Sequence, residues 1–143
     1  MLSDLGITIA TNQVQYSLLS RRVERTGLVD ECRELGTTVI AYSPLAQGLL
    51  TGKYTRANPP PGVRRLRHHR ALGAIPPLIA QLTRIGDQHG RSPGQVALNW
   101  LISKGAIPIP GAKTAEQAWR NAEGSGWQLT DDEVAALDRL GDA

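Results

Sequence analysis

The arrangement of apolar and polar residues predicts three β-strands along the chain. Residues 37–42 are rich in β-branched and aromatic side chains, and residues 107–110 are apolar up to a turn at Gly111. Both stretches have the composition of a buried strand. The apolar residues 7–10 lead into residues 12–17, where polar and apolar side chains alternate as in a strand or its exit loop.

Helical segments are predicted between and after these strands. Leu28, Cys32 and Leu35 recur at helical spacing, and Gly36 then ends the helix. Three more helices open with the pattern of a capping box, a Ser or Thr followed three residues later by Gln or Glu. These pairs are Ser92 with Gln95, Thr114 with Gln117, and Thr130 with Glu133; further helical segments are residues 76–90 and a helix tail at residues 1–6.

Several large or reactive side chains have a predicted structural place. Cys32 and Trp100 lie on apolar helix faces and are expected in the core. Trp119 and Trp127 are expected to pack the final helices against the rest of the fold. His89 stands at a helix C-terminus, where an imidazolium complements the helix dipole.

The alternation of strands and helices predicts a parallel sheet with helices packed outside it. Three strands leave two open edges, and parallel sheets are normally covered on both faces, so the pattern indicates part of a larger fold. A (β/α)₈ barrel of about 250 residues fits, with its phosphate site on the loops after the last strands. Residues 43–70 form a long loop rich in Gly, Pro and Arg, and loops of that length are usually functional or disordered.

The formal charge of +3 and the pI of about 9.4 are too mildly basic to indicate nucleic-acid binding by themselves, and they suit an anionic small ligand equally well. Cys32 is the single cysteine, which favours a reducing compartment. No apolar run approaches the roughly 18 residues of a membrane span, and no secretory signal is recognisable. We expect a cytoplasmic protein that uses no membrane, or a plastid protein if a longer precursor exists.

Residues 107–121 are the first candidate site. A strand turns at Gly111 into a helix, and Lys113 stands just before the helix N-terminus. Unpaired N–H groups, the positive end of the helix dipole and an ammonium together favour a bound phosphate. The alternative is an ordinary strand-to-helix turn with a surface lysine.

Three stretches together resemble the C-terminal half of an aldo-keto reductase, in the same order and spacing: residues 12–19, 41–54 and 109–117. Residues 127–140 also resemble the closing helix of the plant and bacterial-type branch of that family. The resemblance implies an α/β fold, the C-terminal half of a TIM (β/α)₈ barrel with about three βα units and a closing C-terminal helix. Residues 1–143 would form a partial NADP-dependent oxidoreductase domain from which the first half of the barrel is missing.

The resemblance implies that NADP(H) binds at the strand ends. Tyr42 would stack on the nicotinamide ring, and Gln13 would hydrogen-bond its carboxamide. The loop after Tyr42 would line the pyrophosphate with backbone N–H groups, and two basic residues of the long loop would approach the phosphates. These loop residues are Ser43, Pro44, Leu45, Ala46 and Gly48, with Lys53 and Arg64 as the basic pair.

The adenosine end of the cofactor would lie on the first candidate site. Gly111 and Lys113 would hold the 2′-phosphate, and Gln117 and Asn121 would face the adenine. The family often has an acidic residue before that Asn, whereas this chain has Arg120, which adds positive charge and puts the usual adenine contact in doubt.

The catalytic Asp, Tyr, Lys and His of the family belong to the first half of the barrel, so no catalytic residue is assigned here. No metal site is assigned either. The implied reaction is hydride transfer from NADPH to an aldehyde or ketone, and the isolated chain is expected not to catalyse it. A partner chain that supplies the first half would complete a split enzyme with a small carbonyl substrate.

Three alternatives remain. The chain could be an NADP- or anion-binding module without chemistry, or a truncated product that folds poorly. The third is nucleic-acid binding through residues 64–70, where Arg residues surround His68 and His69. A solvated basic loop explains that run more simply, because adjacent His residues without Cys or carboxylate neighbours are poor metal ligands.

Overall fold

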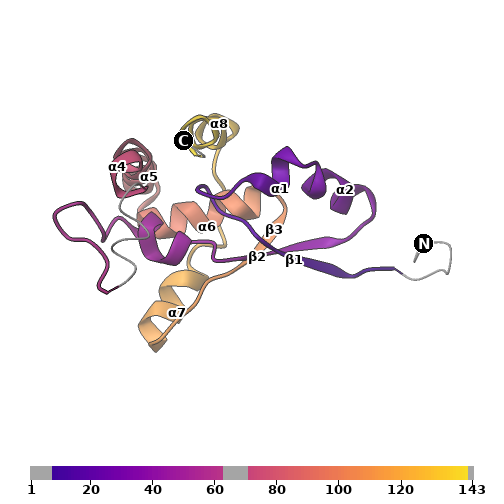
Figure 1. Ribbon diagram of the computed structural model, residues 1–143, viewed down its shortest axis with the longest axis horizontal. Helices are drawn as coiled ribbons and strands as arrows, with labels where there is room; N and C mark the ends of the chain where they lie inside the picture. Colours follow the sequence, from indigo (N-terminus) through magenta and orange to yellow (C-terminus); the bar gives the residue numbers. More distant parts are fainter. Residues whose placement is uncertain (1–7, 63–70, 142–143) are drawn as a thin grey trace.

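The computed structural model describes residues 8–62 and 71–141, and its centre is a three-stranded parallel sheet (Figure 1). The strands β1 (Thr11–Gln15), β2 (Thr38–Tyr42) and β3 (Ala106–Ile109) pair in sequence order. This confirms the predicted parallel sheet. Strand β1 begins only at Thr11, so the apolar residues 8–10 lie outside it, and the helix tail predicted for residues 1–6 lies outside the described residues.

The two faces of the sheet differ in what covers them. Val39, Ala41 and Ala106 point to one face and are buried in the core. Tyr42 and Ile109, which pair with each other, point to the opposite face and remain 40% and 44% exposed. Parallel sheets normally bury both faces, so this open face is an unusual feature of the described residues.

The helices follow the strands and fill the connections between them. Two four-residue helices, α1 and α4, were not predicted, and the long loop that starts at residue 43 contains a 3₁₀ segment, η2. The helices are α1 (Arg22–Arg25), α2 (Leu28–Glu34), η2 (Ala46–Thr51), α4 (Ala71–Ala74), α5 (Pro76–His89), α6 (Pro93–Ser103), α7 (Ala115–Ala122) and α8 (Asp131–Leu140).

Helix α6 is the central helix of the fold. Ser92 and Gln95 form both bonds of the predicted capping box, with Pro93 at the first helical position. Every residue from 94 to 101 is buried, and the helix contacts α5, β3, η2 and α7. A helix that is apolar almost all round belongs in a core, and here it supports both the sheet and the segments that surround it.

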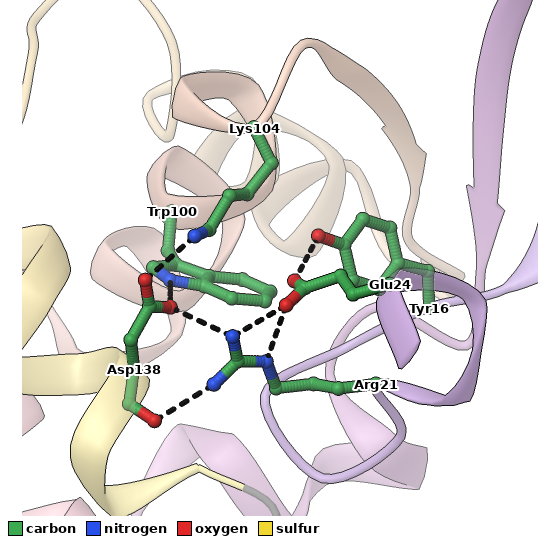
Figure 2. Close-up of polar contacts among 6 residues, drawn as sticks. All are labelled: Tyr16, Arg21, Glu24, Trp100, Lys104 and Asp138. Atoms are coloured by element: carbon green, nitrogen blue, oxygen red, sulfur yellow. Dashed lines mark hydrogen bonds and ion pairs between the residues drawn. The ribbon is translucent and has the colours of Figure 1, made fainter. Parts of the chain in front are cut away.

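A network of charged groups fastens α8 to α6 and to the exit of β1 (Figure 2). The Asp138 carboxylate accepts from the Trp100 indole at 2.9 Å and from the Lys104 ammonium at 2.6 Å. Arg21 donates to the Asp138 carbonyl at 2.7 Å and lies 5.4 Å from the Trp100 ring. Two cations and an indole therefore converge on one residue of the last helix.

The same network reaches the first strand through Glu24. Its carboxylate pairs with the Arg21 guanidinium and accepts a hydrogen bond from the Tyr16 hydroxyl. Burial, and then the bond to Glu24, raise the pKa of Tyr16 far above its ordinary value. A phenol held protonated in this way acts as a fixed hydrogen-bond donor to Glu24.

The structure corrects one prediction about packing. Trp119 is 72% exposed, so it does not pack into the core. Leu35 is the C-cap of α2 and is 60% exposed. Val29 is the partner of Cys32 on the buried face of α2. Trp127 does pack against the core, and its indole donates to the Glu123 carbonyl at 3.2 Å.

His89 pairs with a specific partner as well as standing in the last turn of α5. Its Nε2 lies 2.9 Å from the Glu133 carboxylate at the start of α8, and its ring lies 4.9 Å from that of Trp127. Within the described residues, no helix is long and apolar enough to cross a membrane.

Candidate functional site

The carboxyl ends of the three strands carry residues predicted to bind the cofactor. Gln13 and Tyr42 project from neighbouring strands on the open face, and both are exposed. The pairing places Tyr42 opposite Gln15 on one side and Ile109 on the other. In parallel α/β folds, ligands bind at the carboxyl ends of strands. Tyr42 is the last residue of β2 and therefore lies where a ring could bind, whereas Gln13 is the middle residue of β1 on the same face.

The loop that follows Tyr42 has an unusual backbone. Ser43, Ala46 and Gln47 adopt positive φ values of 54°, 47° and 56°, and Gly48 has a φ of 92°. Residues with a Cβ rarely occupy this region, and a group of them indicates a strained segment held by its surroundings. Such strain is typical of ligand-binding loops, which agrees with the phosphate-lining role implied for this segment.

Some of the backbone N–H groups predicted to bind the pyrophosphate already form hydrogen bonds within the loop. The N–H groups of Ala46 and Gly48 donate to the carbonyls of Ser43 and Leu45, both at 2.9 Å. Pro44 has no N–H. The amides of Ser43 and Leu45 are therefore the candidates within the predicted set for contact with a phosphate.

Lys53 lies against this loop. A Cβ at Gly48 would be 3.3 Å from the Lys53 Cε and 3.7 Å from its Nζ, so the lysine crosses directly beside the glycine. The ammonium also lies 4.7 Å from the Tyr54 ring. The structure thus brings one of the two predicted basic residues to the loop, whereas Arg64, with His68 and His69, lies outside the described residues.

The segment after β3 forms the second part of the candidate site. Gly111, Lys113 and Gln117 are all exposed. The Asn121 amide donates weakly to the Gly111 carbonyl at 3.4 Å, which closes the turn around the start of α7.

The predicted capping box at the start of α7 is only half correct. Thr114 accepts from the Gln117 N–H at 3.2 Å, as expected. The Gln117 side chain reaches past Thr114 and accepts from the Lys113 N–H at 2.8 Å instead. One residue predicted to face the adenine is therefore fixing the backbone of the predicted 2′-phosphate site.

Arg120 is paired on the helix surface. Its guanidinium lies 2.7 Å from the Glu116 carboxylate, one turn earlier, and both side chains are about 70% exposed. Exposed pairs of this kind contribute at most a few tenths of a kcal/mol. The extra charge that Arg120 brings next to Asn121 is thus partly offset by Glu116.

A groove of about 540 Å³ separates α7 from the free edge of β3. Ile107, Pro108 and Pro110 line its strand side, and Ala118 and Asn121 line its helix side. The groove is mainly apolar and lies at the edge of the sheet. Asn121 is the member of the predicted cofactor set that borders it.

Two residues that the sequence did not single out for this site hold the end of α7. Gln95 and Asn99 are buried polar side chains of α6 that hydrogen-bond to backbone groups of residues 120–129. The sequence identified Gln95 only as a helix cap, and nothing in it pointed to Asn99. Their spacing of four residues on a helix was the available signal.

Within residues 8–62 and 71–141, no group of three or more His, Cys, Asp or Glu side chains is placed to hold a metal ion. Lys53 lies 4.7 Å from the Tyr54 ring, and within residues 8–62 and 71–141 no carboxylate forms a hydrogen bond with the hydroxyl of Tyr42 or Tyr54 as Glu24 does with that of Tyr16. The arrangement can bind and orient an anionic ligand, and it offers no evident proton donor within the described residues.

A family model, the Aldo/keto reductase family, matches residues 1–142. The chloroplastic pyridoxal reductase of Arabidopsis thaliana is 41% identical over 96% of this chain and 38% of its own length. Aldo-keto reductase str7 of Strobilurus tenacellus is 38% identical over 92% of this chain and 42% of its own. The chain thus spans about two fifths of the length of the curated relatives it matches.

Solved structures give the same result. The thermostable aldo-keto reductase Tm1743, solved with the inhibitor epalrestat, is 28% identical with a TM-score of 0.75, over 98% of this chain and 43% of that one. A Bombyx mori aldo-keto reductase in complex with NADP is 29% identical with a TM-score of 0.64, over 92% of this chain and 37% of that one. Both neighbours are TIM barrels. With a family model over nearly its whole length and a parallel sheet that matches these enzymes, the chain belongs to the aldo/keto reductase family of oxidoreductases.

Proposed function

We propose that this chain is the cofactor-binding part of an NADP(H)-dependent aldo-keto reductase, equivalent to the C-terminal half of the barrel. One observation carries the proposal. Gln13 and Tyr42 lie on the same open face of two adjacent parallel strands, and the turn at Gly111 follows the carboxyl end of the third strand. The Bombyx mori relative was solved with NADP, and the Arabidopsis thaliana relative is named a pyridoxal reductase.

The chemistry of the exposed groups fits a phosphorylated dinucleotide. Lys53 lies beside the strained loop, and Lys113 stands before α7, so cations flank both regions assigned to phosphates. Tyr42 offers an exposed aromatic face on the open side of the sheet. When bound, NADPH supplies the hydride that reduces a carbonyl.

The chain's own residues bind and orient the cofactor. Tyr42 would hold the nicotinamide ring by stacking, and Gln13 would hold its carboxamide. The loop from Ser43 to Gly48 and Lys53 hold the pyrophosphate, and Lys113 binds the 2′-phosphate. This is catalysis by positioning, while the proton reaches the substrate oxygen from residues of the first barrel half.

The first barrel half also supplies the missing cover of the open sheet face. Its strands pair with the free edges of β1 and β3 and bury Ile107 and Ile109, which are 54% and 44% exposed here. A small aldehyde or ketone binds the completed site. We expect the protein in the cytoplasm, and the chloroplastic name of the Arabidopsis thaliana relative keeps a plastid as the alternative.

Titration of NADPH fluorescence against the purified chain tests cofactor binding. We expect saturable binding that Tyr42→Ala weakens at least tenfold, because the ring loses its stacking surface. Absence of saturable binding by the chain, both alone and with a first-half fragment, would contradict the proposal.

Complementation tests the reaction. The chain alone is expected not to oxidise NADPH in the presence of an aromatic aldehyde. Co-expression with the part of the Arabidopsis thaliana relative that precedes the matched region should restore turnover. Robust turnover by the chain alone, sensitive to Tyr42→Ala, would instead show that it carries its own proton donor.

A further inference from the structure

Helix α7 carries much of the proposed adenosine site, yet apolar packing does not hold it in place. None of its residues is buried, and Trp119 is 72% exposed. Its contacts with the rest of the fold are made mainly through α6. Something other than a hydrophobic face must therefore fix the position of this helix.

Gln95 connects α6 to the last turn of α7. Its side chain is 7% exposed, and its Nε2 donates to the Arg120 carbonyl at 3.0 Å and to the Glu123 carboxylate at 2.9 Å. Its Oε1 accepts from the Ser92 N–H at 2.8 Å, which is the capping-box bond. The buried Gln95 amide thus caps the N-terminus of α6 and also holds the end of α7.

Asn99 lies one turn further along the same face of α6. It is 1% exposed, and its Nδ2 donates to the carbonyls of Gly124 at 3.0 Å and Trp127 at 2.8 Å. Its Oδ1 accepts from the Leu129 N–H at 3.1 Å. The amide is satisfied by the chain segment that follows α7, so that segment cannot move without leaving buried polar groups unpaired.

The backbone at Gly124, just after α7, comes close to α6 beside Asn99. A Cβ at Gly124 would lie 3.0 Å from the Leu98 Cβ, which is tighter than ordinary contact. The glycine lets the segment approach closely enough for Asn99 to reach two carbonyls. Hydrogen bonds and close approach together replace the apolar contacts that α7 lacks.

We infer that Gln95 and Asn99 are positioning residues for the adenosine end of the cofactor site. They act through the backbone of residues 120–129, which fixes α7 and with it the turn that bears Lys113. The inference rests on the proposed function for the identity of the ligand. Loss of these bonds should weaken binding at the adenosine end while leaving the nicotinamide end at Gln13 and Tyr42 unaffected.

The test uses the full chain and two halves of the cofactor, adenosine 2′,5′-bisphosphate and reduced nicotinamide mononucleotide. Gln95→Glu keeps the acceptor for the Ser92 N–H but replaces the donor to α7 with a carboxylate facing Glu123. We expect the Kd for the bisphosphate to rise about tenfold, and the Kd for the mononucleotide to change less than twofold. Equal weakening of both ligands, or of neither, would overturn the inference.

A second substitution provides a rescue. In Gln95→Glu with Glu123→Gln, the amide and the carboxylate exchange sides, so the bond between the two side chains can form again. Bisphosphate binding should recover at least partly in this double variant. Failure of the rescue alongside normal folding would argue against positioning through this contact.

Lys104→Met is the matched control for lost stability, because it removes a bond to Asp138 at the far end of α6. It should lower the thermal midpoint without changing the ratio of the two dissociation constants. Amide hydrogen exchange provides a readout without ligand. The amides of residues 115–122 should exchange faster in Gln95→Glu than in the wild type, and at the wild-type rate in Lys104→Met. If the wild-type chain exchanges as expected but binds no bisphosphate, either alone or with a first-half fragment, the proposed function fails. If exchange over α7 is insensitive to Gln95→Glu, the inference fails.

Discussion

At the scale of single residues, the tightest constraint lies where α5 meets the start of α6. Gly86 is buried within α5, and its carbonyl accepts from the Arg91 N–H at 2.7 Å. A Cβ on Gly86 would lie 2.3 Å from the Arg91 carbonyl oxygen, a rigid backbone atom. Gly73 in α4 has an equally short approach, but to the end of the Arg56 side chain, which can move away.

Gly86→Ala and Gly73→Ala should therefore have opposite effects. Alanine is the better helix former by about 1 kcal/mol. At Gly86, overlap with the Arg91 backbone should outweigh this and lower the free energy of unfolding by about 1–3 kcal/mol. Gly73→Ala should leave stability unchanged or raise it slightly. Urea unfolding of the two variants measures the difference, and equal effects would contradict the packing described here.

Glu133 gives the molecule a predictable pH dependence. Burial alone would raise the pKa of its carboxyl, but hydrogen bonds from Thr130 and His89 outweigh burial and hold the pKa below its ordinary value. A carboxyl with a lowered folded-state pKa stabilises the fold above its unfolded-state pKa of about 4.3. That contribution is lost as the pH falls through the folded-state pKa.

Glu133→Gln keeps an acceptor for the Thr130 N–H and removes the titration. We expect the variant to be less stable than the wild type at pH 6, with the gap closing as the pH falls below about 4. Urea unfolding at pH 6, 4.5 and 3.5 measures the gap. A gap of constant size over this range would show that Glu133 does not titrate differently in the folded and unfolded chains.

Single residues also show what the sequence could not reveal about the site. The pattern at Thr114 and Gln117 is that of a capping box, but the Gln117 side chain can reach either of two adjacent N–H groups, and it bonds Lys113. Asn99 looks like any polar residue within a helix until the segment that it bonds is placed beside it. Contacts between distant segments depend on packing, which local patterns do not encode.

At the scale of elements, α8 is held to the fold by charge as well as by apolar contact. Leu137 is buried, and Asp138 beside it accepts from Trp100 and Lys104 on α6. Arg21 adds an ion pair to the same carboxylate at 3.3 Å. The side chains of Arg21, Lys104 and Asp138 are 15–27% exposed, so solvent screens these charges only in part.

Asp138→Asn should lower the free energy of unfolding by about 1–3 kcal/mol, because it leaves the largely buried Lys104 ammonium without its anion and Arg21 with Glu24 alone. Arg33→Gln is the control, because the ion pair of Arg33 with Asp30 is equally short at 2.6 Å but both side chains are more than 60% exposed. This substitution should change the free energy of unfolding by less than about 0.5 kcal/mol. Chemical unfolding measures both. A double-mutant cycle of Asp138→Asn with Lys104→Met should show coupling, and additive effects would contradict the network.

The elements that the sequence predicted well are those with several independent signals. The helices α5, α6 and α8 combine apolar spacing with caps or terminal glycine, and the structure confirms them within a residue or two. Helices α1 and α4 are four residues long, which is too short for any period to show. Helix α7 was located correctly, but the expectation that Trp119 packs it was wrong, because its attachment is polar.

At the scale of the whole molecule, the sheet presents one face to helices and the other to solvent. The open face carries the proposed cofactor residues together with Ile107 and Ile109. The sequence predicted the parallel sheet from the alternation of strands and helices, and the open edges from the number of strands. It could not show which side chains would share the open face, since that depends on the register of each strand.

Ile107→Gln should affect the stability of the isolated chain and its association with a first-half fragment differently. Ile107 is 54% exposed, so the substitution should change the stability of the isolated chain by less than about 0.5 kcal/mol. In a completed barrel the same side chain is buried, and loss of about 1.5–3 kcal/mol of apolar burial should weaken association with a first-half fragment at least tenfold. Titration of the labelled fragment measures this, and unchanged association would mean that Ile107 stays exposed in the complex.

The two prolines beside the groove make the edges of the sheet unequal. Pro108 lies within β3 and Pro110 just beyond it, and neither has an N–H to offer an added strand. The edge formed by β1 has no proline and can both donate and accept. Copies of the chain that met edge to edge would lose hydrogen bonds along β3, which disfavours growth into a filament. A strand that adds to the β3 edge beside these prolines must therefore supply the N–H groups itself, because β3 can only accept there.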